Sequence, residues 1–220
     1  MRKALIIGGS SGLGLKLAEM LAPDYNVSVT GRRDPKNTLT WFHKLELDSD
    51  SLGKDLDALL LDLSEIDLLV YAAGFYQEGT IDDLSDRDLE KMNRIGLMAP
   101  AMILQRILNQ QTKLPGFIAI TSTSQWTPRL LEPMYTAVKA GLGMLASSIA
   151  KDSRVDKVLV AGPAGMDTRF WEKRPRDPNT IMLDPGWVSE KILDEWEGNF
   201  RYKFIRVLRG PERIEIIETR

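Results

Sequence analysis

Three side chains in the middle of the sequence have the types and the spacing of an acid–base site. Tyr135 stands four residues before Lys139 and thirteen residues after Ser122. A tyrosine hydroxyl has an unperturbed pKa of about 10, so at neutral pH it can protonate a developing alkoxide. If Tyr135 and Lys139 lie one helical turn apart, the ammonium group lowers the pKa of the phenol toward the working pH. Ser122 would then hold a substrate carbonyl.

A glycine-rich segment near the N-terminus is typical of a phosphate-binding turn. Gly8, Gly12 and Gly14 follow a short apolar run at residues 3–7 and precede a helical pattern. Glycine allows positive φ angles and a close approach of the backbone to a phosphate, which the free N–H groups of a helix start can bind. The spacing differs from the common G-x-G-x-x-G fingerprint. A turn of this kind alone can be purely structural, but its place after the first buried strand favours a dinucleotide site.

The end of the expected second strand bears on the choice of dinucleotide. It reads Thr30-Gly31-Arg32-Arg33, without the acidic residue that binds the ribose 2′-hydroxyl of NAD. An arginine can hold the 2′-phosphate of NADP through its fork of donors. We therefore expect NADP(H), with Arg32 and Arg33 as ligands. NAD(H) stays open, because Asp34 tempers the local charge and paired arginines at a loop tip are often only solvated.

Alternating strand and helix patterns predict an α/β fold with a parallel sheet. Strands are expected at residues 3–7, 27–30, 45–47, 66–71, 117–121, 158–161, 202–208 and 213–218, and helices at 13–21, 49–63, 86–109, 135–151 and 187–196. Residues 169–187 show no clear period, which predicts an irregular segment that acts as a mobile flap. Together these patterns predict a Rossmann-like doubly wound parallel sheet in three α/β/α layers, forming a single domain over residues 1–220.

The composition excludes several classes of protein. The 29 basic and 31 acidic residues give no electrostatic case for nucleic acid. The absence of cysteine excludes disulfides and thiolate metal sites and fits a reducing compartment. The apolar run after Met1 ends at Gly8, and no segment reaches the ~18 apolar residues that span a bilayer. We expect a soluble, cytoplasmic protein without a metal, a membrane contact or a nucleic-acid partner.

In this order the motifs resemble those of the short-chain dehydrogenase/reductase family over about residues 1–195. The resemblance implies that Tyr135 is the catalytic acid/base, that Lys139 tunes its pKa and holds the nicotinamide ribose, and that Ser122 orients the carbonyl. It implies that Asn93 holds a water near Lys139, and that Asp48 lies near the adenine ring. The cofactor-binding positions that it implies are Gly8, Ser10, Ser11, Gly12, Leu13, Gly14, Arg32, Arg33, Leu47, Asp48, Ala72, Ala73, Gly74, Tyr135, Lys139, Pro163, Ala164, Met166 and Thr168.

The activity that the resemblance implies is that of an NADP(H)-dependent carbonyl reductase or alcohol dehydrogenase. It would transfer a hydride between the cofactor and a small-molecule carbonyl or alcohol, in a homodimer or homotetramer built through the two long helices. A non-catalytic NADP(H)-binding sensor or scaffold of the same fold is the alternative, although retention of all four catalytic residues argues against it. Epimerase or dehydratase chemistry on nucleotide sugars usually needs a larger C-terminal domain. The sequence does not identify the substrate.

The sequence departs from the family pattern at two places. Tyr71-Ala72-Ala73-Gly74 stands where the family has Asn-Asn-Ala-Gly, so an amide that braces the sheet is missing. Ala164 replaces the glycine that usually follows the counterpart of Pro163, which alters the backbone beside the nicotinamide.

Ser124 is a second candidate for the serine role. Trp126 and Phe170 either line an apolar substrate pocket or close the flap. Four apolar residues of the long helices either form an oligomer interface or belong to the core: Met98, Met102, Leu142 and Met144.

Overall fold

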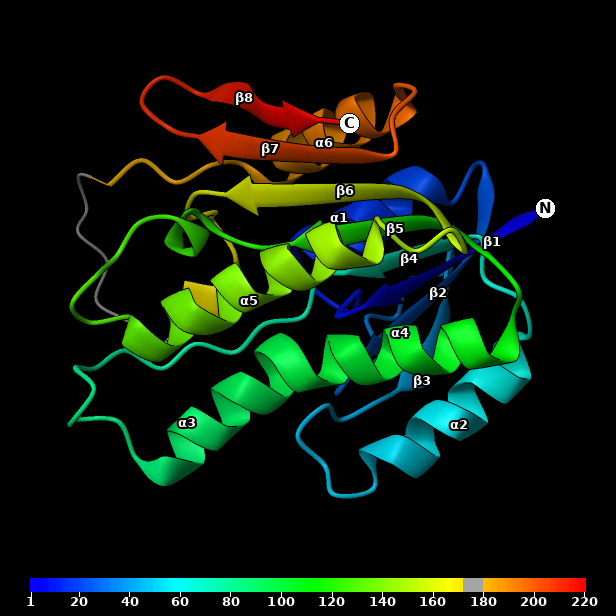
Figure 1. Cartoon of the computed structure of the whole chain (residues 1–220), viewed down its shortest axis with the longest axis horizontal. Helices are drawn as coiled ribbons and strands as arrows, with labels where there is room; N and C mark the ends of the chain where they lie inside the picture. The colour runs from blue at the N-terminus through cyan, green and yellow to red at the C-terminus, as the bar shows by residue number, and fades with distance from the viewer. Residues whose placement is uncertain (172–179) are drawn as a thin grey trace.

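The computed structural model describes residues 1–171 and 180–220, and Figure 1 shows its elements. The strands are β1 (Arg2–Ile7), β2 (Tyr25–Gly31), β3 (Trp41–Lys44), β4 (Leu68–Tyr71), β5 (Leu114–Ile120), β6 (Val155–Pro163), β7 (Tyr202–Leu208) and β8 (Arg213–Thr219). The α-helices are α1 (Gly12–Leu21), α2 (Leu52–Leu63), α3 (Asp86–Asn93), α4 (Ala99–Gln110), α5 (Pro133–Ile149) and α6 (Pro185–Glu197). A π-helical segment, η1 (Arg94–Met98), joins α3 to α4, and the short 3-10 turns η2 (Thr123–Gln125) and η3 (Arg169–Trp171) follow β5 and β6.

Within the described residues, the strands form one sheet in the order β3-β2-β1-β4-β5-β6-β7-β8. Neighbours from β3 to β7 pair in parallel, and β8 pairs with β7 in the antiparallel sense. The chain winds outward from β1 to β3 and then resumes on the other side of β1 with β4. The predicted Rossmann-like doubly wound fold is therefore confirmed. In such sheets ligands bind beyond the carboxyl ends of the strands, where the winding reverses, here between β1 and β4.

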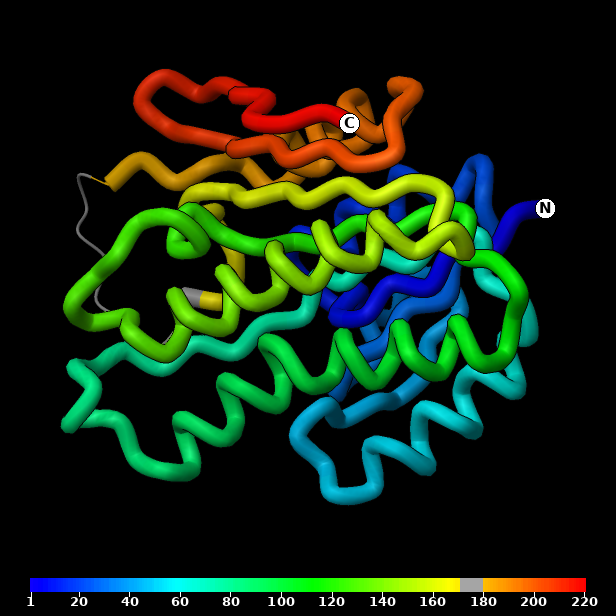
Figure 2. Tube along the Cα trace, viewed as in Figure 1, coloured from blue at the N-terminus to red at the C-terminus, as the bar shows by residue number. Residues whose placement is uncertain are grey.

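Helices cover both faces of the sheet and give three layers (Figure 1). Side chains of β1 alternate between the faces, so that Ile6 lies in one core and Leu5 in the other. On the Ile6 face, α1 and α6 pack together and bury Leu17 and Ile192. The opposite face is covered by α2, α4 and α5 (Figure 2), whose apolar residues join Leu5. No helix in the two described ranges is long and apolar enough to cross a membrane.

The third strand lies earlier in the chain than the sequence predicts. The prediction of a strand at 45–47 is wrong, because β3 spans Trp41–Lys44 and residues 45–47 follow it as a loop. The Leu45 N–H still donates to the Gly31 carbonyl at 3.0 Å, but Gly31 ends β2, so the pairing stops there. Leu45 and Leu47 are nevertheless buried, which explains the misleading apolar pattern.

The long helix predicted at 86–109 is divided into α3, η1 and α4. Pro100 carries no N–H, so in an α-helical register the Gly96 carbonyl would lack its donor. The Ala99 N–H bonds instead to the carbonyl of Arg94, five residues back, as in a π-helix. A π-bulge of this kind kinks a helix, and here it lies directly after the predicted site residue Asn93.

The C-terminal part of the chain extends the sheet. The predicted strands at 202–208 and 213–218 are present as β7 and β8. The helix predicted at 187–196 begins at Pro185, where the Asp184 carboxylate caps it by accepting a hydrogen bond from the Trp187 N–H at 2.7 Å. The predicted flap at 169–187 lies partly outside the described residues.

Candidate active site

The glycine turn lies at the carboxyl end of β1, at the reversal point of the sheet. Gly8 has a φ of +83°, and a Cβ on it would lie 2.7 Å from the Ala73 Cα. A Cβ on Gly14 would collide with the Gly8 carbonyl oxygen. Ser11, the N-cap of α1, makes no side-chain hydrogen bond to the helix. The packing therefore requires glycine at both positions, and the first-turn N–H groups of α1 are not capped by the Ser11 hydroxyl.

Other predicted cofactor residues converge on this turn. Ser10 packs against Gly31 at the tip of β2, and Thr168 lies next to Gly12, with its Cγ2 3.4 Å from where a Cβ would be. Leu13 is buried in the core beneath α1. The structure thus brings together the glycine turn, the tip of β2 and the segment after β6, although these segments are far apart in the sequence.

The segment after β6 is fixed by the neighbouring elements. Ala164 is buried, and its N–H donates to the Val207 carbonyl at 2.8 Å. Met166 forms a parallel bridge with Leu183. The Ala164 methyl group belongs to the core on the α1 and α6 face, which explains why a side chain replaces the family glycine after Pro163.

The loop after β3 carries the predicted adenine-side residues. The Asp48 carboxylate accepts from Lys91 of α3, with 2.6 Å between Oδ2 and Nζ, and Leu47 is buried beside it. Burial alone would raise the pKa of Asp48, but the hydrogen bond and charge of Lys91 lower it overall. Arg32 is exposed and its charge also acts on Asp48. Sequence reasoning missed Lys91, because its pairing joins two distant segments.

Lys139 is buried beside Tyr135 on α5. Its side chain is 4% exposed, and Nζ donates to the Ile120 carbonyl at 3.0 Å. Nζ lies 5.8 Å from the centroid of the Tyr135 ring and 3.7 Å from where a Cβ on Gly74 would be. Burial lowers the pKa of Lys139 to about 8, so the group is still largely charged at pH 7. A positive charge held here favours the phenolate form of Tyr135.

Tyr71 supplies a brace in place of the missing amide. It is fully buried in β4, and its hydroxyl donates to the Ile95 carbonyl in η1. Ile95 needs such a partner, because the Ala99 N–H is bonded to Arg94 and Pro100 has no N–H. Burial raises the pKa of Tyr71, so the hydroxyl stays a donor.

Asn93 ends α3 immediately before this braced segment. It is half-buried, and its side chain makes no capping hydrogen bond to η1. Gly96 packs on α5, since a Cβ there would lie 2.7 Å from Val138 Cγ2. Asn93 is thus joined to the Tyr135–Lys139 helix through helix packing.

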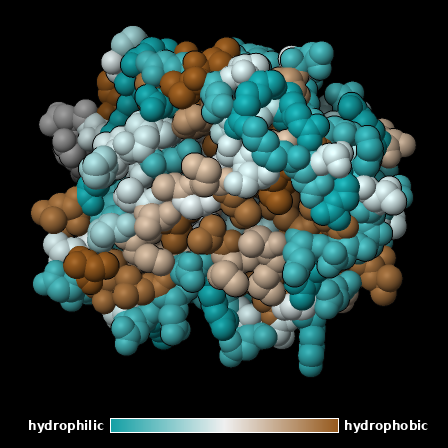
Figure 3. All heavy atoms as spheres, in the orientation of Figure 1, coloured by the Kyte–Doolittle hydropathy of each residue, from teal (hydrophilic) through white to brown (hydrophobic). Residues whose placement is uncertain are grey.

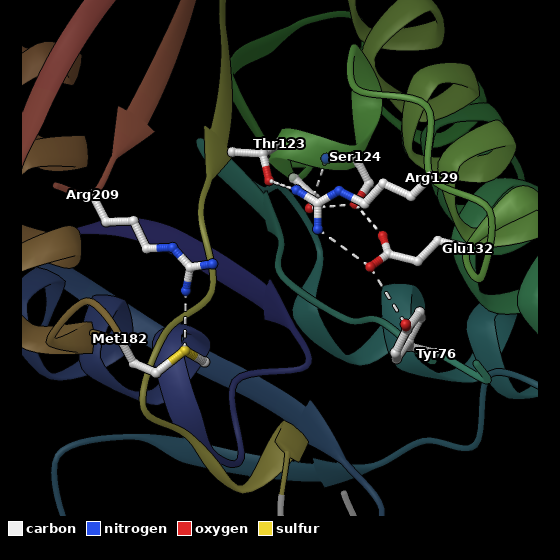
Figure 4. A network of polar contacts seen from close by, with 8 residues as sticks. Tyr76, Thr123, Ser124, Arg129, Glu132, Met182 and Arg209 are labelled. Carbon is white, nitrogen blue, oxygen red and sulfur yellow. Dashed lines mark hydrogen bonds and ion pairs between the residues drawn. The ribbon is translucent and has the colours of Figure 1, made fainter. Parts of the chain in front are cut away.

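Ser122 and Ser124 lie in the turn after β5 (Figure 4 labels Ser124). The Ser124 hydroxyl donates to Glu132 Oε2 at 2.6 Å, and Ser124 is only 2% exposed. Ser122 is half-buried; its Oγ accepts from the Ser124 N–H at 3.1 Å and donates to Ser124 Oγ at 3.3 Å. The Ser124 proton is therefore committed to Glu132, which favours Ser122 over Ser124 as a donor to substrate.

Glu132 is the centre of a polar network that the sequence analysis did not identify (Figure 4). It also accepts from Arg129 Nη1 at 3.3 Å and from the Tyr76 hydroxyl at 3.4 Å. The Tyr76 ring meets the Tyr135 ring edge-on with 4.9 Å between centroids, and Phe170 stacks on Tyr76 at 6.2 Å. The only signal in the sequence is that Glu132 stands three residues before Tyr135.

Trp126 and the only histidine have other surroundings. Trp126 packs edge-on against Phe204, with 5.6 Å between centroids, and its ring fills the space above Gly162, so it closes the β6–β7 core. His43 lines a cavity of about 340 Å³ where β1 to β3 begin, with its Nδ1 3.9 Å from Asp62 Oδ2. None of the predicted site residues lines that cavity.

Comparisons with known proteins identify the family of the chain. A family model described as short chain dehydrogenase matches residues 2–179. The 2,3-dihydro-2,3-dihydroxybenzoate dehydrogenase of Escherichia coli is 27% identical over 159 residues, which are 71% of this chain and 60% of that protein, less than two thirds of its length. A 3-oxoacyl-[acyl-carrier-protein] reductase of Mycobacterium bovis is 29% identical over 174 residues, which are 76% of this chain and 70% of that one.

Solved structures show the same fold. An alcohol dehydrogenase of Thermococcus sibiricus, in complex with 5-hydroxy-NADP, superposes with a TM-score of 0.83 at 19% identity, covering 98% of this chain and 100% of that one. A 3-oxoacyl-(acyl-carrier-protein) reductase of Agrobacterium tumefaciens with NADP bound gives a TM-score of 0.76 at 23% identity, covering 87% and 86%. With the family model matching most of the sequence, the chain belongs to the short-chain dehydrogenase family of oxidoreductases.

Proposed function

We propose that the protein, as one catalytic domain, interconverts a small-molecule carbonyl and the corresponding alcohol with NADP(H), using Tyr135 as the acid/base. The observation that carries this proposal is the buried Lys139 ammonium, held by the Ile120 carbonyl 5.8 Å from the Tyr135 ring. A buried ammonium group is costly even with a hydrogen bond, and lysines whose pKa is shifted by burial often serve in catalysis. Here it lies at the edge of the sheet that also carries the glycine turn.

The residues present fit a dinucleotide. Gly8 and Gly14 leave no room for side chains, so the backbone of the turn can approach a pyrophosphate, which the N-terminus of α1 would bind. Arg32 is exposed at the tip of β2, where it can reach a 2′-phosphate. The NADP-bound structures of similar fold support NADP(H) as the first choice, and NAD(H) is the second.

Each catalytic side chain has a distinct task. The bound nicotinamide supplies or accepts the hydride. In the reductive direction Tyr135 protonates the alkoxide oxygen, and the Lys139 ammonium stabilises the phenolate that remains. Ser122 donates a hydrogen bond to the carbonyl oxygen, and Asn93 supports the site through η1. Relatives named as a dehydrogenase and as a reductase leave both directions of reaction open.

The face formed by α4 and α5 supports the proposal of a homodimer or homotetramer. Leu142 is fully buried and belongs to the core, whereas Met98 is 47% and Met144 is 67% exposed. Figure 3 shows hydrophobic atoms over the middle of this face. Light scattering should report a mass above that of one chain, and Met144→Asp should lower it; a monomeric wild-type protein would contradict this part of the proposal.

The experiment that tests the function uses the purified protein with NADPH and a panel of ketones, diketones and quinones. We expect NADPH to bind, as measured by its fluorescence, and its absorbance to fall with at least one carbonyl. NADH in the same assay tests the cofactor choice. Tight binding of NADPH without turnover of any compound in either direction would instead favour a non-catalytic sensor.

A further inference from the structure

The Glu132 side chain is largely buried, with 12% of it exposed. It lies at the start of α5, directly before Pro133 and three residues before Tyr135. A carboxylate removed from water needs strong hydrogen bonds. Its described side-chain partners are Ser124 at 2.6 Å, Arg129 at 3.3 Å and Tyr76 at 3.4 Å. The short bond to Ser124 is the strongest of the three by distance.

The first of these bonds determines which way the serine protons point. A serine hydroxyl has a single proton, and the proton of Ser124 is held by Glu132. Ser124 can therefore only accept from Ser122, at 3.3 Å. That bond is long and weak, so a substrate carbonyl at a shorter distance would take the Ser122 proton in its place. Glu132 thus anchors Ser124, and the Ser124 N–H in turn holds the Ser122 oxygen at 3.1 Å.

The other oxygen of the carboxylate has a longer contact. Oε1 accepts from the Tyr76 hydroxyl at 3.4 Å, which is beyond the usual range for a hydrogen bond between two oxygens, so this contact adds little. Arg129, which is 40% exposed, balances the charge of Glu132 from the solvent side and also donates to Thr123 Oγ1 at 3.1 Å.

We propose that Glu132 is a positioning residue, which anchors the Ser124 hydroxyl and thereby fixes the place of the Ser122 hydroxyl that donates to a substrate carbonyl. This inference rests on the proposed oxidoreductase function. Glu132 touches neither reacting atoms nor cofactor; it acts through Ser124.

The test removes and then restores the hydrogen bond between residue 132 and Ser124. In Glu132→Leu the side chain cannot accept a hydrogen bond, so the Ser124 hydroxyl loses its anchor and the turn no longer fixes the Ser122 oxygen. We expect kcat for carbonyl reduction to fall at least tenfold, as for loss of a donor to the developing oxyanion, while the Kd for NADPH stays within twofold. Glu132→Gln, whose amide can still hydrogen-bond to the Ser124 hydroxyl, should keep a large part of kcat.

The controls separate this role from folding and from the proposed function itself. Glu190→Gln, at an exposed glutamate on α6, should leave kcat unchanged. If Glu132→Leu does not fold, as judged by circular dichroism, Glu132→Asp keeps the charge, withdraws the carboxylate from Ser124 and should also lower kcat. Unchanged kcat in the folded Glu132→Leu or Glu132→Asp variant, or a Glu132→Gln variant as slow as these, would overturn the inference. Absence of turnover in the wild-type protein would overturn the proposed function instead.

Discussion

Replacing Lys139 by methionine should remove a pH dependence of stability that the burial of the ammonium group creates. Methionine has a similar length and no charge, so it can occupy the same apolar space. It also leaves the Ile120 carbonyl without its donor, which costs about 1–3 kcal/mol. That loss does not vary with pH, so it displaces the whole stability curve without changing its slope.

The magnitude follows from the difference in pKa between the folded and unfolded protein. The pKa of Lys139 is about 8 in the folded protein against 10.5 ordinarily. Below about pH 8 both states carry the proton, and the burial penalty is constant. Between about pH 8 and 10.5 the unfolded state binds more protons, so stability rises with pH. Integrated from pH 7 to 9, the gain is about 1 kcal/mol, which corresponds to about 2–4 °C in Tm for a protein of this size.

Urea denaturation of the apo protein at a series of pH values between 7 and 9 measures this difference. The free energy of unfolding of the wild-type protein should rise by about 1 kcal/mol relative to Lys139→Met over that range. Lys151→Met, at an exposed lysine just after the same helix, should stay parallel to the wild type. Parallel curves for the wild type and Lys139→Met would refute the conclusion that burial depresses the lysine pKa.

Three further changes have defined outcomes. Tyr71→Phe leaves the buried Ile95 carbonyl without its hydroxyl partner and should lower the free energy of unfolding by about 1–3 kcal/mol in urea; no loss would show that the brace is dispensable. Arg32→Asp should raise the Kd for NADPH relative to that for NADH in fluorescence titrations, and an unaltered ratio would exclude Arg32 as the phosphate ligand. Lys91→Met should destabilise the protein near pH 7, because Lys91 lowers the pKa of Asp48, and the deficit should shrink in denaturation curves as the pH falls through 4 toward 3; a deficit independent of pH would contradict the pairing.

The doubly wound sheet is predictable from this sequence because its central strands are short apolar runs that end in turn residues, as residues 3–7 end at Gly8. The edge strand β3 is not, since its two apolar residues are followed by His43 and Lys44 and show no strand pattern, while the buried Leu45 and Leu47 imitate a strand. The interruption of the long helix depends on Pro100, which is visible in the sequence. It also depends on the close packing of Gly96 against α5, a long-range contact that residue spacing does not reveal.

The same distinction applies to the candidate site. Tyr135 and Lys139 can be paired from the sequence because residues four apart on a helix share a face. Glu132 could not be assigned a role, because its role depends on the turn after β5 folding Ser124 back onto the start of α5. Lys91 was missed for the same reason, since only the folded chain places it against Asp48.

The central claim is that Tyr135 is the acid/base of an NADP(H)-dependent reaction, and Tyr135→Phe tests it most directly. The variant removes one oxygen atom and keeps the ring that packs against Tyr76. With the best carbonyl substrate of the panel, we predict a loss of at least about 100-fold in kcat, with the Kd for NADPH changed by no more than a few-fold. A folded Tyr135→Phe protein that consumes NADPH at the wild-type rate would contradict the account.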